Sequence, residues 1–146
     1  MRKRIKRRVS SPWDHPSLQP TGNLAVTDLA DLQLRELLAL DALTKAQGCR
    51  MDLRDLLVSA AVARELAALG YGADELPGLD AADAVLLPLK ALPTGAIGLA
   101  APEAVQAIRW LLTYHHAQRT AATRRDYLRS LAKVQAEPSR YGIWRA

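Results

Sequence analysis

Apolar residues recur along the chain with the spacing of α-helices, and they predict four helical segments. The first segment begins at Thr27 or Asp28, where Thr27 can cap it, and ends near Gln47, before Gly48. Because its leucines cover more than half of the helix circumference, we expect this helix at the centre of the core. These leucines are Leu32, Leu34, Leu37, Leu38, Leu40 and Leu43.

The second segment has the clearest limits, with Asp52 as the expected N-cap and Gly70 as the stop. Two apolar rows predict neighbours on two sides of this helix. The first row changes from leucine to alanine along the helix, which allows a neighbouring helix to approach closely at the far end. The rows are Leu53, Leu56, Leu57, Ala60, Ala63 and Ala67, and Val58, Val62, Leu66 and Leu69.

The third segment, about 74–92, is expected to be kinked or interrupted at Pro88, because the proline ring removes one backbone donor and clashes with the preceding turn. The fourth starts at Pro102 and meets no further Gly or Pro until Pro138, so one helix of about 50 Å is possible. Its middle, 118–126, is poor in large apolar residues, so the helix either breaks there or protrudes. The alanine- and leucine-rich composition also favours helix over sheet. The predicted fold is therefore all-α, a four-helix core with a long C-terminal helix.

Three regions follow from this pattern. Residues 24–136 form the helical domain, and residues 137–146 form a C-terminal tail. Residues 1–23 are predicted to be an extended basic N-terminal arm, because like charges repel one another and Pro12, Pro16 and Pro20 block helix formation.

The charge is strongly uneven along the chain. Residues 1–8 carry a charge of +6, residues 9–118 carry −6 with seven basic and thirteen acidic side chains, and residues 119–146 carry +5. Two basic ends around an acidic body suggest a polyanionic partner. Each basic residue of the arm can contact a phosphate: Arg2, Lys3, Arg4, Lys6, Arg7 and Arg8.

A second basic group lies near the C-terminal end. Arg125, Arg129 and Lys133 are spaced four residues apart and form one ridge on a helix, with Arg124 beside it. Together with the aromatic residues of this region, such a ridge can hold phosphates and stack bases. A solvated helix face explains the same pattern equally well.

Aromatic residues near both ends, Trp13, Tyr141 and Trp144, can dock into a partner or fold back onto the chain's own helices. The leading hypothesis is a non-enzymatic, regulatory helical protein that contacts nucleic acid or a nucleoprotein complex. The alternative is a protein–protein adaptor or inhibitor, or a homodimer, that uses the long C-terminal helix and the Trp-bearing ends.

The residues whose side chains could act in catalysis or bind a metal do not form a recognisable active site. Asp52/Asp55 and Asp80/Asp83 stand at predicted helix starts, where capping explains them. His115 and His116 point about 100° apart on a helix and have no ligand-type residue three or four positions away. Cys49 is a single free thiol. We therefore predict no enzyme activity, no cofactor and no metal.

The expected location is the cytoplasm. The basic start is followed by prolines where a signal peptide needs an apolar stretch, and no apolar run reaches the length of a membrane span. A membrane partner is accordingly not expected.

Overall fold

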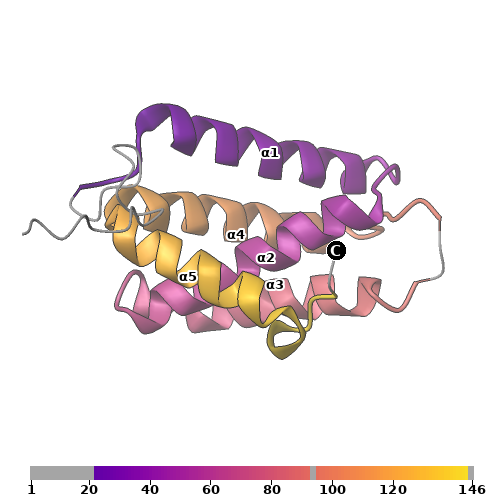
Figure 1. Ribbon diagram of the computed structural model, residues 1–146. Coiled ribbons are helices and arrows are strands. Elements are labelled where there is room, and N and C mark those ends of the chain that lie inside the picture. Colours follow the sequence, from indigo (N-terminus) through magenta and orange to yellow (C-terminus); the bar gives the residue numbers. More distant parts are fainter. Residues whose placement is uncertain (1–21, 93–94, 145–146) are drawn as a thin grey trace, which may run out of the picture.

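The computed structural model describes residues 22–92 and 95–144, which form a bundle of helices without a strand (Figure 1). The predicted all-α fold is confirmed, but the described ranges contain five α-helices rather than four. The arm residues Arg2, Lys3, Arg4, Lys6, Arg7, Arg8 and Trp13 lie outside the described residues. The elements are α1 (Val26–Thr44), α2 (Arg50–Ala68), η3 (Ala73–Glu75), α3 (Leu76–Leu89), α4 (Pro102–Ala121), α5 (Arg124–Ala136) and η4 (Pro138–Tyr141).

The central helix is α2, which packs against α1, α3, α4 and α5. Every member of its predicted leucine-to-alanine row is buried. In the second row Val62 and Leu66 are buried, whereas Leu69 at the end of the helix is exposed. Small side chains along α2 leave room for neighbours on several sides, so one helix can hold the bundle together.

The expectation that the first helix is central was wrong. α1 packs mainly against α2 and α4 and forms an outer layer of the bundle (Figure 1). With neighbours on one side only, it buries Leu40 and Leu43 but leaves Leu34, Leu37 and Leu38 between 47% and 60% exposed.

The start of α2 lies one turn before the position expected from the sequence. Cys49 is the N-cap, and Asp52 stands three residues later, where its carboxylate accepts a hydrogen bond from the Cys49 amide at 2.7 Å. This is the reciprocal arrangement of a capping box, and Asp52 has the role of its acidic member. Gly48, just before the cap, exchanges two backbone hydrogen bonds with Ile97.

The predicted long C-terminal helix was also wrong, because the chain breaks between α4 and α5. Ala122 is extended, with ψ 148°, and fully buried. Thr123 then caps α5, its Oγ1 accepting a hydrogen bond from the Asp126 amide at 3.1 Å. A break within residues 118–126 was one of the two outcomes expected from the sequence. It turns α5 back against α2. In the sequence, the start of this new helix is indicated by a threonine with an acidic residue three positions later.

We predict that Thr123→Ala lowers the free energy of unfolding by about 1 kcal/mol, because the first turn of α5 loses its side-chain cap. Urea unfolding followed by circular dichroism measures this. Thr113→Ala, at an exposed position inside α4, is the matched control and is expected to change stability little. Equal effects of the two substitutions would show that the cap does not stabilise the α4–α5 corner.

Candidate nucleic-acid interface and a buried polar cluster

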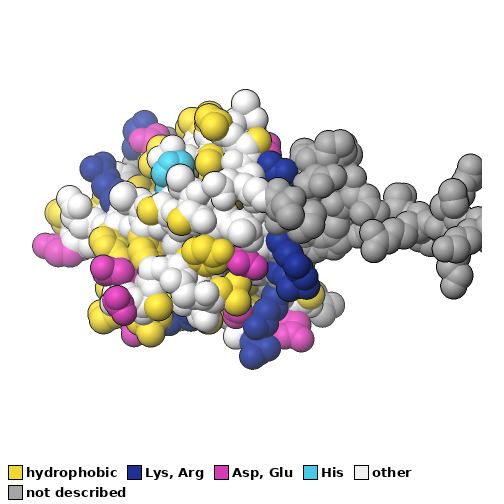
Figure 2. Space-filling view, turned by 90° about the vertical axis from the view of Figure 1, so that its left-hand side faces the viewer, with side chains coloured by type: hydrophobic (Ala, Val, Ile, Leu, Met, Phe, Trp, Pro, Cys, Tyr) yellow, Lys and Arg dark blue, Asp and Glu magenta, His cyan; other side chains and the backbone are white. Residues whose placement is uncertain are grey.

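The predicted basic ridge lies on the outer face of α5. Arg125 and Arg129 are exposed and have no ion-pair partner in the described part of the chain. Lys133 is also exposed, but its Nζ lies 2.9 Å from Glu65 Oε2 on α2. Arg124 is half-buried at the start of the helix. Figure 2 faces the end of the molecule where α5 begins, and it shows a row of Lys and Arg side chains down the right-hand side.

The chain preceding α1 joins the fold at the first turn of α5. Asn23 and Thr123 form an isolated antiparallel bridge, and the Arg124 amide donates to the Gly22 carbonyl at 2.8 Å. Residue 22, where the described structure begins, is therefore held next to the start of the basic ridge. Residues 22 and 23, which precede α1, thus contact residues 123 and 124, which are about 100 positions later in the sequence.

The C-terminal aromatic residues contact the chain's own helices. The Tyr141 hydroxyl donates to Glu65 Oε1 at 2.7 Å, and the Trp144 ring centre lies 4.5 Å from the guanidinium carbon of Arg50. Between them, Ile143 is buried in the core. The use of Tyr141 and Trp144 by a partner stays a prediction, and any such partner would meet residues already engaged with α2.

Glu65 connects this tail to the ridge. Burial works to raise the pKa of its carboxyl, but hydrogen bonds from Tyr141 and Lys133 outweigh burial, and the pKa is lowered. Burial and the hydrogen bond to Glu65 raise the pKa of Tyr141 to about 12. One carboxylate thus holds both the tail and the distal end of the ridge in place.

Other aromatic residues of this region are also engaged internally. Trp110 and Tyr114 stack with ring centres 4.9 Å apart. The Trp110 ring rests on Gly78, where an added Cβ would come within 2.3 Å of a ring atom, and the Tyr114 hydroxyl donates to the Gly72 carbonyl. Tyr127 is buried on the inner face of α5. These rings pack the bundle and are not placed beside the exposed arginines.

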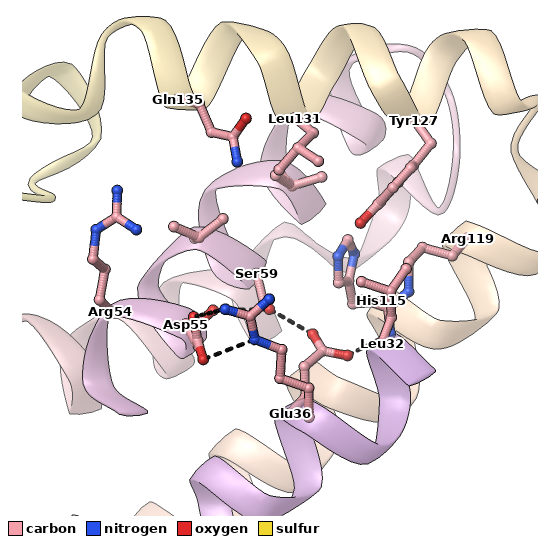
Figure 3. Close-up of a pocket in the computed structure, with 13 residues that line it drawn as sticks. Leu32, Glu36, Arg54, Asp55, Ser59, His115, Arg119, Tyr127, Leu131 and Gln135 are labelled. Carbon is pink, nitrogen blue, oxygen red and sulfur yellow. Dashed lines mark hydrogen bonds and ion pairs between the residues drawn. The ribbon is translucent and has the colours of Figure 1, made fainter. Parts of the chain in front are cut away.

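A buried polar cluster that sequence analysis missed lies between α1, α2 and α4. It consists of Glu36, Ser59, His115, Gln118 and Arg119, all buried. Arg119 Nη2 donates to Glu36 Oε1, and the Ser59 hydroxyl donates to Glu36 Oε2 (Figure 3). The two charged side chains are only 2% and 6% exposed.

A signal for this ion pair was present in the sequence. Glu36 falls four residues before Leu40 and four after Leu32, on the buried stripe of α1. Arg119 follows Leu111, Leu112 and His115 on the buried stripe of α4. Opposite charges at core positions of two helices indicate a buried pair, because an unpaired charge there is very costly.

Gln118 determines the tautomer of His115. Its side-chain Nε2 donates to the Ala63 and Tyr71 carbonyls, both at 2.9 Å, so its Oε1 faces His115 Nδ1 at 3.0 Å as an acceptor. Nδ1 therefore carries the proton. Burial, together with the charge of Arg119, lowers the pKa of His115 to about 4, so the ring is neutral at pH 7.

The cluster does not resemble a metal site. No group of three or more His, Cys, Asp or Glu side chains in residues 22–92 and 95–144 is arranged to hold a metal ion. His116, next to His115, is half-buried, and Cys49 is an exposed free thiol.

Comparison of the chain with protein-family models, with curated proteins and with solved structures gives no match. None of the described helices combines the length and the apolar character required to cross a membrane.

We predict that Arg119→Met lowers the free energy of unfolding by about 3–5 kcal/mol, because it leaves the Glu36 carboxylate buried without a positive partner. The double variant Glu36→Leu/Arg119→Met is expected to be clearly more stable than Arg119→Met alone. Denaturant unfolding of both variants measures the difference. Asp41→Ala, which breaks an exposed pair with Lys45, is the control and is expected to cost less than about 1 kcal/mol. A double variant no more stable than the single one would contradict this account.

We predict that the buried His115 makes the stability of the fold sensitive to acid. Its pKa in the fold is about 4, against 6.5 for an unperturbed histidine, so the unfolded chain binds the proton first as the pH falls. The contribution of neutral His115 to the free energy of unfolding is fully present above pH 6.5. It decreases by about 3 kcal/mol as the pH falls from 6.5 to 4. Unfolding curves at several pH values measure this slope. In His115→Gln the slope between pH 6.5 and 5 is expected to decrease, and an unchanged slope would contradict the assignment.

Proposed function

We propose that this protein binds nucleic acid through one composite basic surface, formed by the arm residues 1–8 and the exposed face of α5. The observation that carries the proposal is the hydrogen bond between the Arg124 amide and the Gly22 carbonyl, which anchors the chain before α1 beside the ridge. Because the chain before α1 is held beside the ridge at residue 22, the six basic residues that precede this point in the sequence and those of α5 can act on one polyanion.

The charges on α5 support this proposal. Arg125 and Arg129 are exposed without an acidic partner in the described ranges, so phosphate binding requires no ion pair to be broken. Their Cβ atoms are neighbours on one helix face, about 5–6 Å apart. The acidic body, by contrast, repels a polyanion and favours binding at this end of the molecule.

The proposed binding mode is contact with the phosphate backbone. Trp110, Tyr114 and Tyr127 are packed within the bundle, and Trp144 lies against Arg50. No described aromatic ring is therefore free beside the arginines to stack on bases. Phosphate contacts give affinity that depends strongly on salt and little on sequence. A regulatory or accessory role in the cytoplasm, on nucleic acid or a nucleoprotein complex, is part of the proposal.

A protein–protein adaptor is the second candidate, and one observation favours it. Leu34, Leu37 and Leu38 are exposed together on α1, which is the kind of apolar surface that partners cover. The features that first suggested an adaptor no longer support it, because the long C-terminal helix is broken and the C-terminal aromatic residues contact α2.

The test is binding of labelled mixed-sequence duplex DNA and structured RNA across a salt series. Six phosphate contacts by the arm contribute about −5 to the log–log salt slope on duplex DNA, so replacing all six basic arm residues with Gln removes about that much. Arg125→Gln/Arg129→Gln is expected to remove about 2 more.

Lys90→Gln/Arg109→Gln, which removes one exposed charge just after α3 and one on α4, is the matched control and is expected to leave the slope nearly unchanged. Absence of binding at low salt, or equal losses from the control and the α5 variant, would overturn the proposal.

A further inference from the structure

A pocket of about 140 Å³ lies next to the buried polar cluster, between α1 and α5. Residues of α2 form its floor, and His115 and Arg119 of α4 close one end (Figure 3). Both α1 and α5 pack on α2, so the pocket is a groove between two helices that share a neighbour. It is separate from the basic ridge, which occupies the opposite face of α5.

The charges that line this pocket leave one positive charge in excess. Asp55 accepts two hydrogen bonds from Arg35, at 3.1 and 3.2 Å, and Glu36 is paired with Arg119. Both carboxylates of the lining are therefore neutralised. Arg54 is half-buried and has no acidic partner among the described residues; its Nε has only a long contact of 3.4 Å with the Trp144 carbonyl. A half-buried cation without an anion is unfavourable, and a bound anion would offset that cost.

Two further donors line the same pocket. No described acceptor takes the proton of the Tyr127 hydroxyl. Figure 3 shows this hydroxyl directed into the pocket. The Gln135 amide has no hydrogen-bond partner in the described part of the chain. His115 adds no charge at pH 7, because burial lowers its pKa.

The remaining lining is apolar and comes from Leu32, Val58, Val62 and Leu131. The pocket volume is close to the ~150 Å³ of an apolar cavity that accommodates benzene. A few converging polar groups on an apolar wall are typical of small-molecule sites.

We propose that this pocket binds a small organic monocarboxylate with an apolar body of about six heavy atoms. The carboxylate pairs with Arg54 and accepts a hydrogen bond from Gln135, which lies at the same end of the pocket, while the body packs against the aliphatic wall toward Tyr127 (Figure 3). A dianion such as phosphate is disfavoured, because Asp55 and Glu36 line the same space and only one positive charge is in excess. The proposal is independent of nucleic-acid binding by the ridge.

The test is a titration of the full chain with benzoate, followed by two-dimensional amide NMR. Saturable shifts are expected at the pocket residues of α2 and α5, and benzamide, its neutral analogue, is expected to bind at least tenfold more weakly. Arg54→Gln is expected to weaken benzoate binding about tenfold, and Gln135→Ala, which removes the side-chain amide, severalfold. Arg109→Gln, an exposed charge outside the pocket, is the control and is expected to leave the affinity unchanged.

The proposal is overturned if benzoate, phenylacetate and 3-methylbutyrate all fail to saturate at millimolar concentrations. Equal binding of benzoate and benzamide, or equal weakening by Arg54→Gln and Arg109→Gln, overturns it as well. Because Arg54 is only half-buried and Gln135 is exposed, both variants are expected to fold.

Discussion

The ion pair between Glu36 and Arg119 joins α1 to α4 inside the core, and α2 contributes one further hydrogen bond to it. Removing two charges from water costs several kcal/mol for each ion, which mutual attraction repays only when other hydrogen bonds complete the site. Ser59 of α2 donates to the second oxygen of Glu36, whereas Arg119 Nε is buried without a hydrogen-bond partner among the described residues. Three helices thus meet at one pair of charges, and their positions relative to one another depend on it.

The corner between α4 and α5 is the second constraint, because it determines where the basic surface lies. Without the break at Ala122, residues 124–136 would continue away from the bundle, and their basic residues would be remote from the start of α1. With the break, α5 returns along α2, and the Arg124 amide binds the Gly22 carbonyl. Tyr71 supports this corner, its hydroxyl donating to Asp126 at 2.7 Å.

α5 has two different surfaces as a result. Arg125 and Arg129 face solvent on one side, while Tyr127, Leu131 and Gln135 line the pocket on the other. A helix between a proposed polyanion surface and a proposed ligand pocket gives the two sites a common element. Each site still rests on its own charges: exposed arginines in one case, and the half-buried Arg54 in the other.

The sequence by itself determined the all-α class, the buried row of α2 and the spacing of the basic ridge of α5, because helical spacing places residues three and four apart on one face. It offered the break between α4 and α5 only as an alternative to one long helix. It did not determine that α1 is peripheral, since the number of faces a helix buries depends on neighbours distant in the chain. Nor did it show that Glu36 meets Arg119, 83 residues away, or that residue 22 meets residue 124. Only the tertiary structure decided these points, because periodicity describes the face of one helix, whereas pairing depends on how several faces pack together.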